Sequence, residues 1–429
     1  MKGANMRTSG TSHLSIPVSN DLLEEIIEKA TALSVSIEDY LASLISRNAK
    51  FPLPEYEKQS EDKSSLETDD PIYETFSAFK KFRDKIYAET TENPHPSEEF
   101  PTMRLFTEKV EKGMQDFISE ASESEEKRKK IIERILSEGA VRRISPLPDP
   151  EVWGGLLEQF PNFNKVTAKI QSLAMIGKLG GGRPVPIPPL LLVGPPGIGK
   201  SAYLKKLAHI LDVGITFMDC SSQSSASSLT GLSFTFKSGN LGPVAKLLCF
   251  GSEANPLFIL DEIEKSATGR DHGNILDALH NLLERVTAKD FSDEGLGVEF
   301  PIDTSWITWI ATANSLDGIP SSLLSRFLVY FIDPPSQGEM ARSVIPSIYE
   351  TLRESLPIKE KLADLSNEIV DSLKTLSPRE VRKSLEEGIE KASRRTYFNN
   401  GLKSGEKITV IREDIGIRKI SERERVGFI

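Results

Sequence analysis

The sequence predicts an α/β protein in which a parallel β-sheet with a helical lid follows a mostly helical N-terminal region. Three short apolar runs support this prediction, at residues 189–193, 256–260 and 306–313. Each has the length and composition of a buried parallel strand. Segments with apolar residues at helical spacing separate the runs, and this alternation is typical of a parallel sheet.

The beginning of the chain predicts a small strand–helix–helix element over residues 1–49. Leu14, Ile16 and Val18 alternate as in a strand, and two helical patterns follow. Ser19 or Asn20 can cap the first helix, and Ser36 can cap the second. This order resembles a ribbon-helix-helix unit, a fold that dimerises and binds DNA. The resemblance leaves two interpretations open, a DNA-binding element and a dimerisation or interaction element.

The outward positions of the predicted strand favour the second interpretation. Ribbon-helix-helix units often carry basic or amide side chains there, whereas this sequence has His13, Ser15 and Pro17. Pro17 would also remove a hydrogen-bond donor from a strand ladder. DNA is therefore a possible partner but a less favoured one.

Composition divides the rest of the chain. An acidic, proline-containing stretch predicts a linker. The helical periodicity that follows predicts a stalk or a platform for a partner. A proline-rich turn near residue 148 marks the end of this helical region. We expect the strand–helix–helix element at residues 1–49, the linker at 50–71 and the helical region at 72–148. The α/β domain is expected at residues 149–335, and the lid with its tail at 336–429.

The bulk composition narrows the function. A net charge of −10 argues against a broad electrostatic grip on nucleic acid. Cys220 and Cys249 lack zinc-site spacing, and the five histidines show no metal-ligand pattern. No apolar run approaches the roughly 18 residues of a membrane span, and the N-terminus has no apolar signal core. We expect a soluble, cytoplasmic protein without a membrane partner.

A phosphate-binding loop is the most specific motif. It follows the first predicted strand and precedes a helix, which is the context that the pattern G-x-x-x-x-G-K-S requires. Backbone N–H groups of such a loop and the start of the helix cradle a phosphate. We expect ATP and Mg²⁺ as cofactors, with Lys200 reaching the phosphates and Ser201 holding the metal. The loop consists of Gly194, Pro195, Pro196, Gly197, Ile198, Gly199, Lys200 and Ser201.

The next two strands end in candidate catalytic residues. The second ends in Asp261, placed to bind Mg²⁺ through water, and Glu262, placed to orient the water that attacks the γ-phosphate. The third is followed by Asn314, whose amide could sense the γ-phosphate or help to hold that water. Arg326 lies at the end of a further helical pattern, where a lone arginine is usually a surface charge.

In this order the motifs resemble those of AAA+ ATPases, most closely the ATPase module of Lon-type proteases. The similar segments are residues 194–201, 255–265, 291–293 and 311–327, within a similarity that runs from about residue 155 to residue 415. The resemblance implies the sheet and lid of an AAA+ P-loop NTPase.

The resemblance also assigns roles to single residues. It implies that Arg326 is an arginine finger that acts on the neighbouring subunit, where such a group contributes roughly 10³–10⁵ in rate. It places Arg379 at the second-sensor position of the lid, with Arg382 as the nearby competitor. It aligns Phe236 with the pore aromatic that grips a threaded polypeptide, and the alternative is an ordinary core phenylalanine. Residues 287–297 could form a second axial loop.

The preferred function is therefore an ATP-hydrolysing motor that assembles into a ring, with six subunits implied by the resemblance, and remodels or threads a protein substrate or partner. Because the similarity ends near residue 415, we expect no protease activity in this sequence. The alternative is an ATP-switched, DNA-associated regulatory ATPase that uses the N-terminal element. A scaffold that binds ATP without turnover is a third interpretation, and Glu262 and Arg326 argue against it.

Overall fold

The computed structural model describes residues 4–7, 13–16, 100–222, 225–236, 238–266, 275–398 and 406–416. The chain divides into two compact units, residues 1–99 and 100–429. In the first, β1 (Ala4–Arg7) pairs antiparallel with β2 (His13–Ile16). Strand β2 lies where alternation predicted a strand. The two predicted helices that follow it, the linker and the part of the predicted helical region before residue 100 lie outside the described residues.

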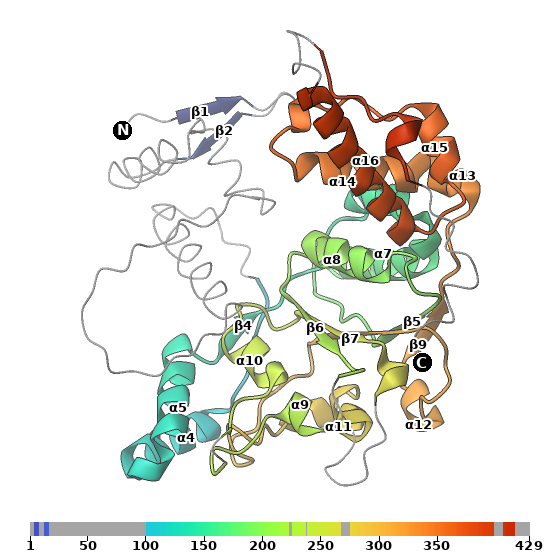
Figure 1. Ribbon diagram of the computed structural model, residues 1–429. Coiled ribbons are helices and arrows are strands. Elements are labelled where there is room, and N and C mark those ends of the chain that lie inside the picture. The colour runs from blue at the N-terminus through green and yellow to red at the C-terminus, as the bar shows by residue number, and fades with distance from the viewer. Residues whose placement is uncertain are drawn as a thin grey trace. The chain divides into compact units, whose positions relative to one another are not determined.

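The second unit is built on a five-stranded parallel sheet, which confirms the predicted fold class (Figure 1). The strand order is β6-β7-β8-β5-β9, so β5 lies between β8 and β9. The carboxyl ends of β5, β7 and β8 therefore meet at one edge of the sheet, where parallel sheets bind ligands. The strands are β5 (Leu190–Val193), β6 (Ile215–Asp219), β7 (Leu257–Asp261), β8 (Thr308–Ala313) and β9 (Leu328–Phe331).

Both faces of the sheet are buried, which explains why its central strands are continuous apolar runs. In β5, Leu190 and Leu192 belong to one core, and Leu191 and Val193 to the other. The first core contains residues of α6 (Gly154–Gln159), α7 (Asn164–Leu179) and α8 (Lys200–Leu211). The second contains residues of α9 (Ser227–Thr230), α10 (Pro243–Cys249), α11 (Ile275–Leu282) and α12 (Ser321–Leu324).

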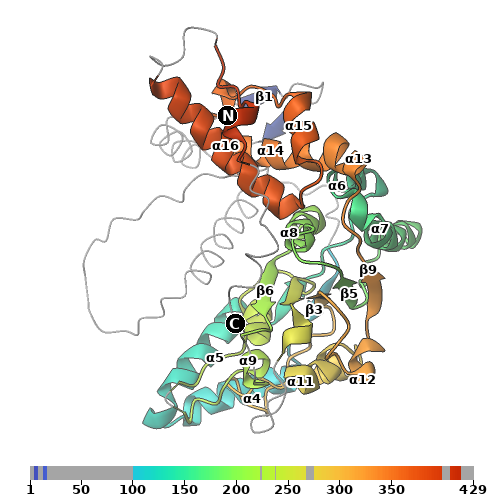
Figure 2. The same ribbon diagram turned by 45° about the vertical axis from the view of Figure 1, so that its right-hand side comes forward.

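The predicted helical lid has a core of its own. Its longest helix is α16, and residues 408–415 return to pack on it (Figure 2). The lid helices are α13 (Gln337–Glu339), α14 (Ile345–Glu354), α15 (Asn367–Leu373) and α16 (Pro378–Phe398).

A helical hairpin before the sheet belongs to the same unit. Its elements are β3 (Thr102–Arg104), α4 (Glu108–Glu120), α5 (Glu126–Glu138) and β4 (Val141–Arg143). Strands β3 and β4 pair antiparallel and close the hairpin. Apolar residues of both helices, including Met114 and Ile132, are buried in the second core of the sheet. This part of the expected N-terminal region is therefore packed on the α/β domain and is not a free stalk.

Candidate functional site

The glycine loop joins β5 to α8, and its three glycines occupy positions that a residue with a side chain would not fit without strain. A Cβ added to Gly194 would lie 2.3 Å from the backbone oxygen of Ile332, which leaves no space for a side chain. Gly197 and Gly199 have φ angles of +82° and +103°, which favour glycine. Gly199 directly precedes Lys200, the first residue of α8. The loop thus forms a close-packed cradle at the start of a helix, which is an anion-binding arrangement.

Lys200 points from α8 back across the loop toward the end of β8. Its Nζ donates to the backbone oxygens of Gly194 and Pro195, the latter at 3.3 Å, and to Oδ1 of Asn314 at 3.4 Å. Burial lowers the pKa of Lys200, while the negative charges of Asp261, Glu264 and Glu262 oppose that shift. The ammonium is therefore held close to three carboxylates at the edge of the sheet.

The two predicted carboxylates follow β7 and are fixed by a threonine from β8. Thr312, which is fully buried, donates its hydroxyl to Oδ1 of Asp261 and accepts a bond from the backbone N–H of Glu262 at 3.2 Å. Glu262 has the left-handed backbone conformation, with φ 53° and ψ 49°, which is uncommon for a residue other than glycine. This local turn separates the directions of the two neighbouring acids. Such strained backbone is frequent at functional sites.

Glu262 is held in its ionised form. Its Oε2 lies 2.7 Å from Nζ of Lys265, and its Oε1 accepts a 3.4 Å bond from Nδ2 of Asn314. The bond from Lys265 is the main cause that lowers the pKa of Glu262. A carboxylate kept ionised at the edge of the sheet has the charge that a water-polarising group needs.

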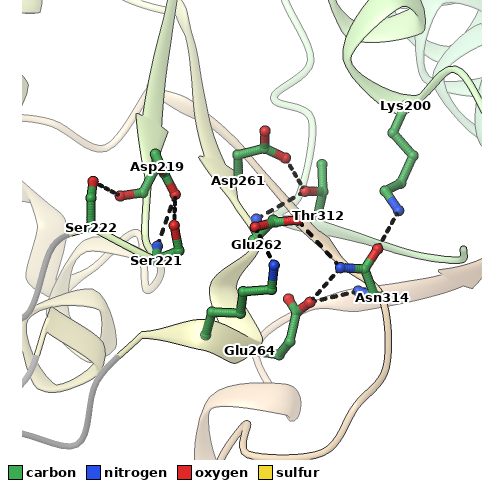
Figure 3. A network of polar contacts seen from close by, with 10 residues as sticks. Lys200, Asp219, Ser221, Ser222, Asp261, Glu262, Glu264, Thr312 and Asn314 are labelled. Carbon is green, nitrogen blue, oxygen red and sulfur yellow. Dashed lines mark hydrogen bonds and ion pairs between the residues drawn. The ribbon is translucent and has the colours of Figure 1, made fainter. Parts of the chain in front are cut away.

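Asn314 lies at the centre of the network in Figure 3, between Lys200 and two glutamates. Its Nδ2 donates to Oε1 of Glu264 at 2.8 Å, and its backbone N–H donates to the same oxygen at 3.0 Å. The sequence pattern did not indicate Glu264, which lies in the short 3₁₀ helix Ile263–Lys265. It also missed Thr312, although a polar residue in a fully buried strand was a signal, since a buried hydroxyl requires a partner.

The lid reaches the phosphate loop through Arg379. The backbone N–H of Arg379 donates to the oxygen of Gly197 at 3.3 Å, and its Cβ would lie 3.3 Å from a Cβ on that glycine. Arg382, the competing arginine, instead forms a 2.9 Å ion pair with Glu386 along the exposed side of α16. Of the two arginines, Arg379 is the one that lies at the loop.

Arg326 follows α12 and makes its contacts away from the phosphate loop. Its Nη1 donates to the oxygen of Ser322 at 2.7 Å, and its Nη2 lies 3.6 Å from a carboxylate oxygen of Glu284. Its Nε is buried without a hydrogen-bond partner within the described part of the chain. The structure therefore does not bring Arg326 together with Lys200 and Asn314 in one chain.

Phe236 lies on a hairpin loop between α9 and α10. A bridge between Leu232 and Asn240 closes this loop, with two backbone hydrogen bonds of 2.9 Å. The Phe236 side chain is 59% exposed, so the interpretation of this residue as part of the core is wrong. In the predicted second axial loop, the Asp293 side chain is buried. Val298, which directly follows residues 287–297, is 69% exposed.

The residues expected to hold a metal are oxygen donors, as Mg²⁺ prefers. Asp261 lies in the charge environment of Lys200, and Ser201 is the second residue of α8. Within the described ranges, no group of three or more acidic, histidine or cysteine side chains could hold a metal by itself. These donors fit a metal that is also coordinated by nucleotide phosphates, the arrangement in which Mg²⁺ usually binds.

In the part of the chain that the structure describes, no helix is both long and apolar enough to cross a membrane.

Comparison with known proteins identifies the domain around this site. Residues 190–334 match the model of the "ATPase family associated with various cellular activities (AAA)". The Lon protease of Mycoplasma pneumoniae is 29% identical over 55% of this chain and 29% of its own length. The mitochondrial Lon protease homolog of Schizosaccharomyces pombe is 27% identical over 54% of this chain and 22% of its own length.

A third relative, the Lon protease of Wolbachia pipientis, is 28% identical over 56% of this chain and 30% of its own length. Among solved structures, a chain in the closed state of Hsp104 with ATPγS and FITC casein has a TM-score of 0.48 and 16% identity, covering 68% of this chain and 51% of that one. The chain thus spans less than a third of the curated relatives just named. The chain carries an ATPase domain of the AAA family, similar in sequence to the AAA+ module of Lon-type proteases.

Proposed function

We propose that this protein is an ATP-driven motor that assembles into a ring and remodels or threads a protein substrate or partner. The ATPase domain supports the first part of this proposal. An arginine placed away from its own phosphate loop supports assembly, and an exposed aromatic loop supports a polypeptide substrate. ATP binding, hydrolysis and contact with a polypeptide each require different residues.

In this motor, ATP would bind to the loop of residues 194–199, to Lys200 and to Arg379. Gly194, Gly197 and Gly199 let the loop approach the phosphates closely, and Lys200 supplies the positive charge. Ser201 and Asp261 would hold Mg²⁺, which neutralises phosphate charge when it is bound.

For hydrolysis, Glu262 and Asn314 would position the attacking water. Glu262 is ionised and can accept a proton or a hydrogen bond from the water. Asn314 contacts both Lys200 and Glu262, so its amide links the phosphate-binding group to the water-positioning group. A ring supplies the missing cation, because Arg326 of one subunit would complete the site of the next. Heterologous contacts that close generate such rings.

The observation that carries the protein-substrate part is the exposure of Phe236. An aromatic ring that is 59% exposed at the tip of a closed loop has no core to stabilise. It can wedge against any polypeptide without reading its sequence, because its contact is apolar and non-directional.

The test is the stimulation of ATPase activity by a permanently unfolded polypeptide, such as reduced and carboxymethylated α-lactalbumin. We expect Phe236→Ala to keep basal hydrolysis and to lose stimulation. Phe398→Ala is the matched control, because Phe398 is 74% exposed on the lid and should leave stimulation intact. Equal stimulation of wild type and Phe236→Ala would remove the threading part of the proposal. The predicted helices on which the DNA-associated alternative depends lie outside the described residues.

A further inference from the structure

Glu264 holds both the backbone and the side chain of Asn314 with one oxygen. Its Oε1 accepts the backbone N–H of Asn314 at 3.0 Å and the side-chain Nδ2 at 2.8 Å (Figure 3). These two bonds fix the point where the chain leaves β8 and the direction of the amide that follows. Its Oε2 is buried without a hydrogen-bond partner among the described residues. The hydrogen bonds of this carboxylate therefore come from Asn314.

The orientation of the Asn314 amide depends on Glu264 more than on Glu262. The bond from Nδ2 to Glu264 is 2.8 Å long, whereas the bond to Glu262 is 3.4 Å. With Nδ2 directed to the carboxylates, Oδ1 accepts from the Lys200 ammonium at 3.4 Å. A flipped amide would place its oxygen against a carboxylate and its NH₂ against a cation, and both contacts would be repulsive.

Glu264 also leaves Glu262 available for chemistry. Glu262 has one oxygen paired with Lys265 at 2.7 Å and only the long 3.4 Å contact with Asn314 on the other. Because Glu264 carries the orientation of the amide, Glu262 does not have to. The two glutamates, two positions apart on a 3₁₀ turn, thus divide the work of the site.

We infer that Glu264 is a positioning residue for ATP hydrolysis, which acts by accepting the backbone and side-chain N–H groups of Asn314 and so keeping the Asn314 oxygen on Lys200. This inference rests on the proposed ATPase function of the site. Glu264 acts through an acceptor oxygen at a set distance, and its negative charge is not the essential property. That distinction makes the inference testable with two conservative substitutions.

Glu264→Asp keeps the charge but withdraws the acceptor by one methylene, whereas Glu264→Gln keeps an acceptor oxygen in place and removes the charge. We expect Glu264→Asp to lower kcat roughly 10-fold or more, as losses of residues that orient a functional group do. The KM for ATP should change less than about threefold, since the phosphate loop is intact. Glu264→Gln should stay within about threefold of wild type. Glu386→Asp, which shortens a glutamate in an exposed ion pair on the lid, is the control.

A double-mutant cycle tests whether Glu264 acts through Asn314. In an Asn314→Ala background, adding Glu264→Asp should lower kcat no further. An additional loss in that background, an unchanged kcat in Glu264→Asp alone, or a loss in Glu264→Gln as large as in Asn314→Ala would each overturn the inference. If Glu264→Asp does not fold, Glu264→Ala takes its place, with the same expected loss of kcat and the same test in the Asn314→Ala background. A wild-type protein without ATPase activity would contradict the proposed function itself, which separates the two failures.

Discussion

Asp293 accepts a hydrogen bond from the backbone N–H of Gly242, with 2.8 Å between Oδ2 and the nitrogen. Its other oxygen accepts the N–H of Leu296 at 2.9 Å, and the Asp293 side chain is completely buried. Gly242 ends the segment that carries Phe236, whereas Leu296 belongs to the segment that exposes Val298. One carboxylate therefore connects the base of the Phe236 loop to the segment predicted to form a second axial loop.

Asp293 also makes a prediction about stability and pH. Burial raises the pKa of Asp293 to about 6, although hydrogen bonds from Leu296, Gly242 and Gly295 oppose the shift. A raised pKa in the folded state means that stability is full at low pH and is lost as the pH rises through about 6. The free energy of unfolding of wild type, relative to Asp293→Asn, should therefore fall by about 2 kcal/mol between pH 4 and pH 7.

Urea unfolding of both variants across that pH range measures the difference. Asp290→Asn is the control, since Asp290 lies three residues away and is exposed, and its curve should run parallel to wild type. Parallel curves for wild type and Asp293→Asn would contradict the burial of an ionisable carboxyl at this position.

The second prediction concerns Glu262. Glu262→Gln removes the ionised carboxylate but keeps the phosphate loop, so turnover should fall roughly 100-fold or more while ATP still binds. The trapped ATP state should then be the assembled state. Mass photometry with ATP and Mg²⁺ should show a species of about six times the 47.5 kDa chain, in line with closed-ring assembly.

Nucleotide-free protein is the comparison for that measurement. A shift in mass only with ATP would connect assembly to the nucleotide site. A persistent monomer or dimer of Glu262→Gln would count against the ring and against any action of Arg326 on a neighbour.

The sequence pattern predicted the sheet because the features that identify a buried strand lie within a few neighbouring residues. Each buried strand needs a continuous apolar run, and each functional group follows directly after one, as Asp261 follows β7 and Asn314 follows β8. Glu264 was missed because its role depends on a contact with a residue 50 positions away, which no spacing reveals.

The charge run of residues 123–130 shows the same limit. A run of charged residues is usually a solvated helix face. Here, however, Arg128 stacks over the rings of Phe117 and Phe300, at 4.5 and 5.3 Å, and donates to the oxygen of Leu296 at 2.7 Å. Only tertiary packing of the α4–α5 hairpin on the loop after Asp293 selects this one member of the run.

The third prediction concerns Arg142, which fastens the hairpin to α10. Arg142 is 2% exposed and donates to the backbone oxygens of Leu248, at 2.8 Å, and Cys249, where α10 ends. Arg142→Met would leave those buried carbonyls without donors and should lower the free energy of unfolding by about 3 kcal/mol. Urea denaturation measures it. Arg104→Met, which removes a surface ion pair with Glu111 and a 3.4 Å hydrogen bond to the backbone oxygen of Phe106, should cost about 1 kcal/mol or less.

The fourth prediction tests whether Arg326 acts on a neighbouring subunit. Arg326→Ala should abolish most ATPase activity, and so should Glu262→Gln, each for its own reason. In a mixed ring, the site of an Arg326→Ala subunit keeps Glu262 and can receive Arg326 from a Glu262→Gln neighbour. That interface has every wild-type group, so mixing two inactive proteins should restore activity.

The size of the recovery follows from the geometry of the ring. In head-to-tail rings of randomly mixed subunits at equal amounts, about a quarter of the interfaces combine the two intact halves. Activity should recover toward that level in this mixture. A mixture of Arg326→Ala and Lys200→Ala should recover equally, because Lys200→Ala subunits also carry Arg326. Recovery in the first mixture without recovery in the second would contradict a trans-acting arginine. Both mixtures should therefore recover, and recovery in neither would mean that Arg326 acts within its own chain, where Ser322 and Glu284 already hold it.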